Sequence, residues 1–555
     1  MLDAVGGVRG ACALSRILVL GGYGGFGARL SRRLAARAHD VIVAGRSVAK
    51  AEAFCAAHSG MTPLAADRNG DIGAVLEACR PDVLIDAAGP FQDSDYRVPL
   101  ACARAGVGYI DLADARAFVT GIRALDEAAR AAGVAIIAGA SSVPALSGAV
   151  ARRLSEGMDR VCAVEIAISA SNHATAGASI AAAILSYVGR PVRLWRGRRW
   201  DRGWGWQELR RETFGVEGAG DLRNRWLAIA DVPDHDLLPE SLPGRPSVVF
   251  RAGTESAMQT VGLWLLSWPV RWFSVKSLAH IAPMLLPLQR LSRWMSDGRS
   301  AMLVRVKGEA GGAFVERQWT LIATDGDGPE IPTLAAVLLA EAVAAGTIAP
   351  GARDAGRLLD LEAFEPLFQT LSIRHAITER VLPAPLYARV MGQRFDALPD
   401  AVRAMHRVCG DAGASGEATV ERGDGVAARL VATVMGFPRA GTHPLHVTFI
   451  ERDGVERWTR TFGDRSFTSD LSERNGRVVE RFGPLRFQFD LPSDARGLEM
   501  RIVGWSCFGV PLPLALAPQS MAREWAEAGR FHFDVPIALP LVGLVVHYRG
   551  WLVVD

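Results

Sequence analysis

Glycine is concentrated at one point of the chain, where five of the seven residues from 21 to 27 are glycine. This stretch has the spacing G-x-G-x-x-G and lies between an apolar run and a helical pattern. In that setting the first glycine permits a tight turn, the second lets the backbone approach a pyrophosphate, and the third lets the helix pack closely on a sheet. The N–H groups at the start of the helix attract phosphate. The spacing predicts a dinucleotide site formed by Gly22, Tyr23, Gly24, Gly25, Phe26 and Gly27.

The residues after the second apolar run indicate which dinucleotide binds. An Asp or Glu at this place hydrogen-bonds the ribose 2′-OH of NAD, but this chain has Ala44-Gly45-Arg46-Ser47 and no carboxylate. The guanidinium of Arg46 suits a 2′-phosphate, and Ser47 can both cap the next helix and donate to the same phosphate. We therefore expect NADP(H) as the cofactor. The alternative, a solvated surface arginine at position 46, stays open.

Two more segments are expected to complete the cofactor site. Asp67 follows the third apolar run, where a carboxylate can contact the adenine amine or simply close a turn. Small residues follow the fourth run, at the carboxyl edge of the sheet where ligands collect in such folds. The nicotinamide ribose is expected to pass along Ala87, Ala88, Gly89 and Pro90.

Asp111 and Asp114 are the candidate catalytic residues. Both come at or after the end of the fifth apolar run, where a carboxylate can steer a proton or orient an amine. An Asp at a strand end is also an ordinary helix cap, and this alternative stays open. No metal site is expected, because neither the histidines nor the seven cysteines have the spacing of metal ligands.

The elements that must position these residues alternate between short apolar strands and amphipathic helices. Helical patterns are typical of residues 28–38, 48–58 and 117–132. We expect an α/β domain over residues 15–148, with a doubly wound parallel sheet of the Rossmann type and helices on both faces. The strands are expected at residues 17–20, 41–43, 62–65, 83–85, 109–111 and 134–137.

The rest of the chain is expected to form two further domains. Residues 149–380 predict an α+β domain for substrate binding or dimerisation. The proline-bearing VLPAPLY marks a boundary. Beyond it, a helix over 386–407 and many short alternating strands predict a mainly antiparallel β domain over residues 384–555.

A hydrophobic segment, residues 257–288, is rich in Trp, Leu and Met. Charged residues and prolines interrupt it, so no run reaches the roughly 20 residues of a spanning helix. Three interpretations stay open: a buried or interface helix pair, a peripheral membrane contact, and a greasy substrate channel.

Length and composition limit the class of protein. The 555 residues are too many for one core, and the net charge of +3 with dispersed arginines argues against a nucleic-acid partner. The dispersed cysteines indicate reduced thiols, and the apolar N-terminal run leads into the glycine cluster instead of a cleavage site. We expect a cytoplasmic protein, with association to a membrane and a homodimer as open alternatives.

The stretches ILVLGGYGGFG, VIVAGRS, VLIDAAGPF, YIDLAD and GASSVPALS resemble the NADP-binding domain of the saccharopine dehydrogenase-like family. The middle of the chain resembles that family's second domain more loosely, and the last third looks like an uncharacterised bacterial domain (DUF4166-like) found C-terminal to such reductases. The resemblance implies an NADP(H)-dependent oxidoreductase, with the segment Tyr109–Asp114 near cofactor and substrate. The family often has Glu after Gly where this chain has Ala113-Asp114, so the resemblance does not transfer a substrate.

Three functions are weighed. The first is reduction, at C=C or C=O, of a hydrophobic or acyl-type small molecule, a class that includes lipid-like substrates. The second is C=N reduction or oxidation of an amino-acid adduct, for which Arg251, Arg271 and Arg305 are the candidate carboxylate clamps. The third is a non-catalytic protein that binds NADP(H) and a lipid.

Overall fold

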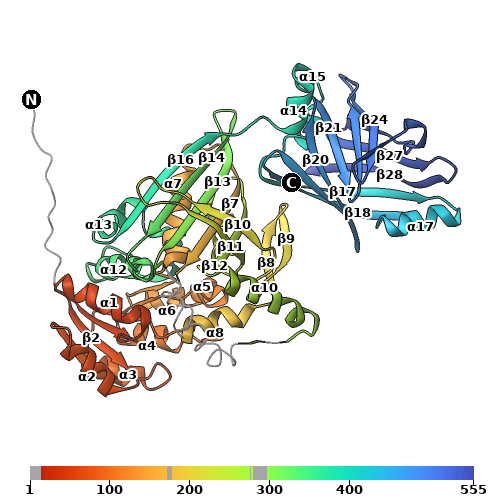
Figure 1. Ribbon diagram of the computed structural model, residues 1–555. Coiled ribbons are helices and arrows are strands. Elements are labelled where there is room, and N and C mark those ends of the chain that lie inside the picture. The colour runs from red at the N-terminus through yellow and green to blue at the C-terminus, as the bar shows by residue number, and fades with distance from the viewer. Residues whose placement is uncertain (1–13, 172–177, 276, 279–296) are drawn as a thin grey trace, which may run out of the picture.

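The computed structural model describes residues 14–171, 178–275, 277–278 and 297–555. Figure 1 shows an α/β domain at the N-terminal end, a second sheet in the middle of the molecule, and a separate β domain at the C-terminal end. The expected fold class is confirmed in all three parts.

The N-terminal domain is built on a seven-stranded parallel sheet in the order β15-β6-β5-β4-β1-β2-β3. The first six strands lie where the sequence predicts them. The strands are β1 (Arg16–Leu20), β2 (Asp40–Gly45), β3 (Met61–Ala65), β4 (Val83–Asp86), β5 (Gly108–Asp111), β6 (Ala135–Ala138) and β15 (Gly351–Asp354). The helices are α1 (Gly25–Ala36), α2 (Val48–Ala56), α3 (Ile72–Cys79), α4 (Arg97–Ala105), α5 (Arg116–Gly121) and α6 (Asp126–Ala131).

Strand β1 shows why this sheet is covered on both faces. Ile17 and Val19 pack into one hydrophobic cluster, while Leu18 and Leu20 pack into another on the opposite face. A strand that is apolar at every position must be buried on both sides, which is typical of parallel sheets with helices on both faces. The carboxyl ends of the strands are therefore the free edge at which a ligand can lie.

The seventh strand of this sheet comes from a distant part of the chain. Strand β15 pairs with β6 in parallel, and helix α12 (Ile331–Ala344) packs on α1, β4 and β5. The sequence analysis placed both elements in the middle domain. The apolar composition of α12 fits either assignment, because a buried helix reads alike whichever sheet it covers, and the sequence GARD of β15 carries no apolar pattern.

The middle domain has a seven-stranded mixed sheet in the order β10-β11-β12-β7-β13-β14-β16. Only β12 and β7 pair in parallel. The strands are β7 (Arg160–Ala170), β10 (Arg210–Phe214), β11 (Leu222–Ile229), β12 (Ser247–Thr254), β13 (Ser300–Ala310), β14 (Ala313–Ala323) and β16 (Ile373–Val381), beside a hairpin of β8 (Pro191–Arg196) and β9 (Arg199–Trp204). The helices include α7 (Ser147–Ser155), α8 (Ala178–Tyr187), α9 (Asp234–Ser241), α10 (Ala257–Trp272) and α13 (Glu365–Phe368).

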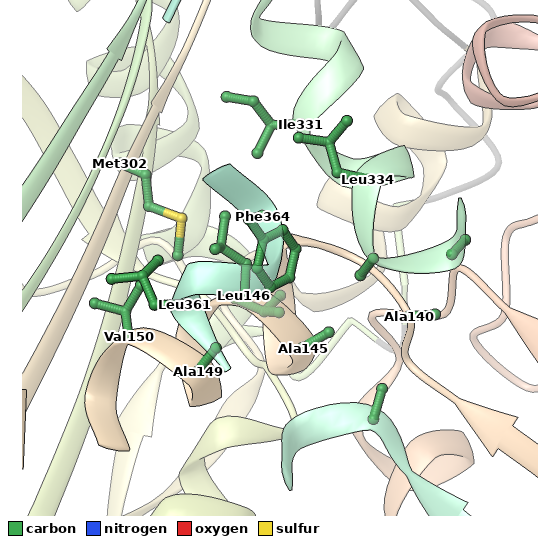
Figure 2. Packing of buried hydrophobic residues seen from close by; sticks show 14 of the residues in the cluster. Ala140, Ala145, Leu146, Ala149, Val150, Met302, Ile331, Leu334, Leu361 and Phe364 are labelled. Carbon is green, nitrogen blue, oxygen red and sulfur yellow. The ribbon is translucent and has the colours of Figure 1, made fainter. Parts of the chain in front are cut away.

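One hydrophobic cluster joins the N-terminal and middle domains. Figure 2 shows Phe364 beside Leu146, with Leu361, Met302 of β13 and Leu334 of α12 around them. The same cluster reaches the strands of the N-terminal sheet on one side and the strands of the middle sheet on the other. A continuous close-packed core fixes the two sheets relative to each other.

The C-terminal strands close into a barrel. They run in the order β22-β21-β20-β19-β18-β17-β28-β27-β26-β24, and β22 also pairs with β24 to close the ring of ten strands. The strands are β17 (Asp411–Arg422), β18 (Gly441–Arg452), β19 (Val455–Phe462), β20 (Arg465–Arg474), β21 (Arg477–Phe482), β22 (Leu485–Asp490), β24 (Gly497–Cys507), β26 (Met521–Glu527), β27 (Arg530–Leu539) and β28 (Gly543–Val554), with the short β23 (Ser493–Asp494) and β25 (Val510–Leu512) beside β24.

Short helices flank the barrel. The helix expected over 386–407 is three pieces: α14 (Leu386–Met391), α15 (Gln393–Asp396) and α16 (Asp400–Met405). Gly392 has a φ of 56° and separates the first two, and Pro399 precedes the third. A fourth helix, α17 (Val426–Val434), lies between β17 and β18.

The hydrophobic segment 257–288 is described only in part, because residues 276 and 279–288 lie outside the described residues. Its first part forms α10, which exposes Met258, Leu265 and Trp272 at intervals of seven residues. Among the described residues, no helix combines the length and apolar character needed to cross a membrane. Contact of this segment with a membrane surface stays a prediction.

Candidate cofactor and active site

A cleft of about 980 Å³ lies along the carboxyl edge of the N-terminal sheet and extends to the middle domain. Most of the predicted site residues line it. These are Tyr23, Gly24, Gly25, Phe26, Arg46, Asp67, Ala87, Ala88, Gly89, Pro90 and Asp114. Four others, Gly22, Gly27, Ser47 and Asp111, do not line it and support it from behind.

The glycine loop is shaped by backbone contacts that leave no room for side chains. A Cβ at Gly27 would lie 2.1 Å from the carbonyl oxygen of Gly21, so this glycine lets α1 pack onto the loop. The tight turn was expected at Gly22, but the positive φ, 72°, belongs to Gly21. Gly22 instead packs tightly, since its Cβ would meet the Val19 carbonyl oxygen at 2.9 Å. The two consecutive glycines at positions 21 and 22 were the signal that the tight turn could lie one residue earlier than expected.

The open side of the loop is a cradle for an anion. A Cβ at Gly25 would meet nothing within 4 Å, and one at Gly24 would meet only the Gly21 carbonyl oxygen, at 3.0 Å. Helix α1 begins here with no acidic residue in its first turn. Free N–H groups and a positive helix end facing an empty cleft suit a pyrophosphate, so the residues present fit the predicted dinucleotide.

Arg46 is exposed in the cleft and forms no ion pair or hydrogen bond with the described residues. Tyr23 fixes the turn that carries it: the Tyr23 hydroxyl accepts a hydrogen bond from the Ser47 N–H at 3.0 Å. The Ser47 hydroxyl caps α2 by accepting from the Lys50 N–H at 3.4 Å. Ser47 therefore caps α2 as expected, whereas its contact with a phosphate stays a prediction.

Beside Asp67 lies Arg68, a residue that the sequence analysis did not single out. The Asp67 carboxylate closes a turn by accepting from the Asn69 N–H at 3.0 Å. The Arg68 side chain lines the cleft, and its Nε donates to buried Asp86 at 2.6 Å. Its Nη2 is buried without a hydrogen-bond partner. An unpaired guanidinium N–H at this edge is a second observation that fits a polar ligand.

The Arg68 position could have been found from the strand pattern. Asp86 is the last residue of β4, fully buried, and its other oxygen accepts from the Ala88 N–H at 3.0 Å. A buried carboxylate needs a cation, and Arg68 lies three residues after the end of β3, the strand that precedes β4 along the chain. The pair also shapes the segment Ala87–Pro90, where the nicotinamide end is expected.

The structure separates the two candidate catalytic carboxyls. Asp111 is fully buried below the cleft, where one oxygen accepts from the Ala113 N–H at 2.9 Å and the Gly139 N–H at 2.8 Å. Burial raises the pKa of Asp111 to about 7. The Asp111 side chain does not line the cleft and holds two loops together, and the catalytic role expected of it stays a prediction.

Asp114 faces the cleft, which agrees with the place expected for it. Its carboxylate accepts from the side-chain amide of Gln92 at 3.3 Å. The surrounding protein raises the pKa of Asp114, because it removes water from around the carboxylate. Asp114 can therefore hold a proton or a cation at the cleft.

The middle domain supplies a wall that is mostly apolar. Its hydrophobic residues include Ile168, Ile184, Phe250 and Met302. Tyr187, the last residue of α8, is a polar group on this wall, and its hydroxyl can accept a hydrogen bond from the Trp206 indole N–H, which leaves the phenol O–H as a donor. Burial, with the nearby charges of Asp114 and Asp231, raises the pKa of Tyr187. The phenol therefore stays protonated and can donate. Sequence reasoning missed it because no motif marks it.

The three arginines considered as carboxylate clamps lie elsewhere. Arg305 donates to Glu165 at 2.9 Å, buried Arg251 lies near the same carboxylate, and Arg271 donates to Gln207 at 2.8 Å. None of them lines the cleft. Among the described residues that line it, the only cations are Arg46, Arg68 and Arg97, all from the N-terminal domain.

Comparison with known proteins agrees with this site. Residues 17–137 match the family model of the saccharopine dehydrogenase NADP binding domain, and residues 398–552 match a domain of unknown function, DUF4166. No curated protein matches the chain. These matches confirm the resemblance inferred from the sequence for the first and the last part of the chain.

Two solved structures are similar to the chain. Apo saccharopine dehydrogenase (L-Glu forming) from Saccharomyces cerevisiae has 13% identity, covers 66% of this chain and 100% of its own, and has a TM-score of 0.46. Amine dehydrogenase from Mycobacterium smegmatis has 14% identity, with 62% and 95% coverage and a TM-score of 0.33. The N-terminal domain of this chain is thus similar to the NADP-binding domain of a dehydrogenase family, and NADP(H) is the cofactor that the match supports.

Proposed function

We propose that this protein is an NADP(H)-dependent oxidoreductase that reduces a hydrophobic, acyl-type molecule at C=C or C=O. The observation that carries the proposal is the composition of the cleft. Its N-terminal side has a glycine cradle and two arginines with free donors, while its middle-domain side is apolar and, among the described residues, has no cation. A substrate with several carboxylates would find no partner on that side.

Each side of the cleft has a separate task in this proposal. Gly24, Gly25 and the start of α1 hold the pyrophosphate, and Arg46 pairs with the 2′-phosphate. When bound, NADPH supplies a hydride. The apolar wall excludes water and holds the substrate chain, and the Tyr187 hydroxyl delivers the proton to the oxygen or carbon that becomes electron-rich. Asp114 and Gln92 orient the polar end of the substrate.

Reduction of a C=N bond is a second candidate, and a specific observation favours it. Asp114 and Asp231 both line the cleft, and two carboxylates stabilise a cationic iminium or amine. Asp231 is already paired with Arg116 at 3.0 Å, which leaves Asp114 as the free carboxylate. The amine in this version lacks carboxylates of its own, because the three arginine clamps lie away from the cleft.

The experiment is a substrate panel with purified full-length protein, followed by NADPH absorbance. With NADPH the panel contains a long-chain α,β-unsaturated acyl thioester, a long-chain ketone and a cyclic imine. Saccharopine is a secondary amine that can only be oxidised, so it is offered with NADP⁺ and followed by the appearance of NADPH. We expect NADPH oxidation with the thioester or the ketone. Turnover with the imine alone would establish the second candidate, and turnover with saccharopine would contradict both. Tight NADPH binding without turnover of any compound would support the non-catalytic alternative.

A further inference from the structure

The barrel contains a cavity that the cofactor cleft does not explain. Its volume is about 190 Å³, and its lining is mostly apolar and includes the aromatic side chains of Phe462, Phe487, Phe489, Phe531 and Phe533. The alternation along β22 produces this lining, since Phe487 and Phe489 are buried while Arg486 and Gln488 are exposed. Apolar cavities of this size stay dry and can hold an organic molecule.

The charged side chains that line the cavity already have partners. Arg460 donates to Glu480 at 3.3 Å, and Glu524 lies 2.6 Å from buried His406. No unpaired charge is therefore left in the described lining to hold a ligand's charged group. A ligand that enters must do so with an apolar chain and leave its polar head outside.

The two ends of the barrel differ. Helix α16 packs against β26, β27 and β28 at the end where β17 begins, and its Met405 forms part of the cavity lining. At the opposite end lie the connections that contain α17, β25 and residues 540–542. The lining reaches this second end through Met435, Pro518 and Leu539.

That second end exposes large apolar side chains, which we call the apolar rim. Helix α17 contributes three at helical spacing, with Val426 83%, Leu430 65% and Val434 77% exposed. The connections 508–520 and 540–542 contain no charged residue. The remaining members of the rim are Phe508, Val510, Leu514, Leu516 and Leu541.

Helix α17 links the rim to the cavity, because its two faces are both apolar. Val431 and Met435 line the cavity, while Leu430 and Val434 face outward. An amphipathic helix that covers a soluble domain normally has a polar outer face. Two apolar faces are typical of a helix that covers a cavity on one side and enters an apolar medium on the other.

The charges near the rim are mostly positive. Arg429 and Arg439 lie in the α17 connection and Arg465 begins β20, against Asp424 and Asp464 at the same end. Connections that are apolar at the tip and basic at the base complement a membrane surface made of anionic lipid.

We propose that the barrel docks on an anionic phospholipid membrane through the apolar rim and receives one acyl chain of a lipid in its cavity. The apolar side chains enter the acyl region, the arginines pair with headgroup phosphates, and α17 sits at the boundary. The chain enters tail first, since the charged side chains of the lining already have partners.

The docking step is tested by sedimentation of the full-length protein with vesicles. The vesicles are phosphatidylcholine alone, or phosphatidylcholine and phosphatidylglycerol in equal parts. We expect binding to the mixed vesicles, and Leu430→Asp is expected to weaken it at least roughly tenfold, because a leucine that enters the membrane is replaced by a carboxylate that the anionic lipid repels. The matched control is Val455→Asp, an exposed position at the opposite end of the barrel, which should bind like the wild type.

Three outcomes of this measurement would overturn the docking proposal. The first is equal binding of Leu430→Asp and the wild type. The second is loss of binding in Leu265→Asp on α10 instead, which would place the contact in the middle domain. The third is binding to neither vesicle.

Acyl insertion is tested separately, with vesicles of the same mixture whose acyl chains carry bromine. Trp458 lines the cavity and is 6% exposed, so an inserted brominated chain should quench its fluorescence. We expect the quenched fraction to fall in Trp458→Phe. An equal quenched fraction in both proteins would exclude a chain in the cavity. Neither experiment requires NADPH or turnover, so failure of the oxidoreductase proposal would leave both results interpretable.

Discussion

On the cofactor side of the cleft, the groups that face the proposed ligand are mainly backbone atoms and a few cations, whereas in the barrel they are apolar side chains contributed by most of the strands. The shape of the cleft depends on positions that have no side chain, such as Gly24 and Gly27, and a side chain at any one of them would destroy that shape. The barrel depends on many contacts of which each is small. A single substitution should therefore abolish ligand binding in the cradle, whereas each substitution in the apolar lining should weaken ligand binding only a little.

The largest effect is expected from Gly24→Val. A branched side chain there meets the Gly21 carbonyl oxygen and projects into the cradle, so NADPH affinity should fall by at least roughly 100-fold with the fold retained. Calorimetry measures the affinity and circular dichroism the fold. Gly262→Val on exposed α10, where a Cβ meets nothing within 4 Å, is the matched control. Unchanged affinity in Gly24→Val would mean that the phosphates lie elsewhere.

The second largest effect is expected on kcat, when the proposed proton donor is removed. Tyr187→Phe removes the hydroxyl but keeps the ring, so kcat should fall about 10²- to 10⁴-fold while NADPH affinity stays the same. Steady-state kinetics with the active compound of the panel measures it. Tyr96→Phe is the control, because the Tyr96 hydroxyl donates to the Phe118 carbonyl outside the cleft lining. Full activity in Tyr187→Phe would assign the proton to another group.

A third prediction concerns Asp111, which lies below the cleft, and the pH dependence of the free energy of unfolding. Asp111 titrates at about 7 in the folded protein and near ~3.9 when unfolded. Between these values the folded protein keeps a proton that the unfolded chain has lost, so its contribution to the free energy of unfolding falls as the pH rises.

Asp111→Asn removes this titration. Relative to the wild type, the variant should gain roughly 2–4 kcal/mol in free energy of unfolding between about pH 4 and pH 7, and no more above that. Urea denaturation at a series of pH values measures the difference. A difference that does not change with pH would show that Asp111 has an ordinary pKa.

The fourth prediction tests the choice between the two dinucleotides. Arg46→Asp removes a charge-assisted pair and adds repulsion, so NADPH should bind about 10- to 100-fold more weakly. NADH affinity is the internal control, since it has no 2′-phosphate and should change little. Equal losses for both dinucleotides would contradict the assignment of Arg46.

The smallest effect is expected in the barrel. Phe487→Leu removes part of one aromatic contact among many, so the affinity for the mixed vesicles should fall by only about fourfold, the equivalent of one methylene. A complete loss in this variant would break the comparison, because it would give the lining a single indispensable contact like that of the cradle.

The difference between the two sites also explains how much the sequence could predict. Glycine spacing at 21–27 reports a backbone shape directly, so the cradle and the strands around it were predictable, apart from the one-residue shift to Gly21. Arg46 was predictable because its place after β2 is fixed by the same pattern. Local patterns carry such information when all the partners are near in sequence.

Other features depend on partners that are distant in sequence. Arg68 can be recognised as a site residue only once it lies beside Asp86. Tyr187 can be recognised only once the middle domain is folded against the cleft. The barrel closes through the pairing of β22 with β24, and alternation within one strand cannot report that closure. For the same reason the return of β15 to the first sheet could not be read from residues 351–354.

That return has a consequence for synthesis of the chain. Strand β6 ends at Ala138, but its outer neighbour β15 begins only at Gly351, and the helix that covers β4 and β5 begins at Ile331. A nascent polypeptide that has just emerged past β6 carries an open hydrogen-bonding edge and an uncovered apolar face. The first domain therefore matures only after the second has been translated, and a gene fragment that stops between the two would yield an aggregation-prone product.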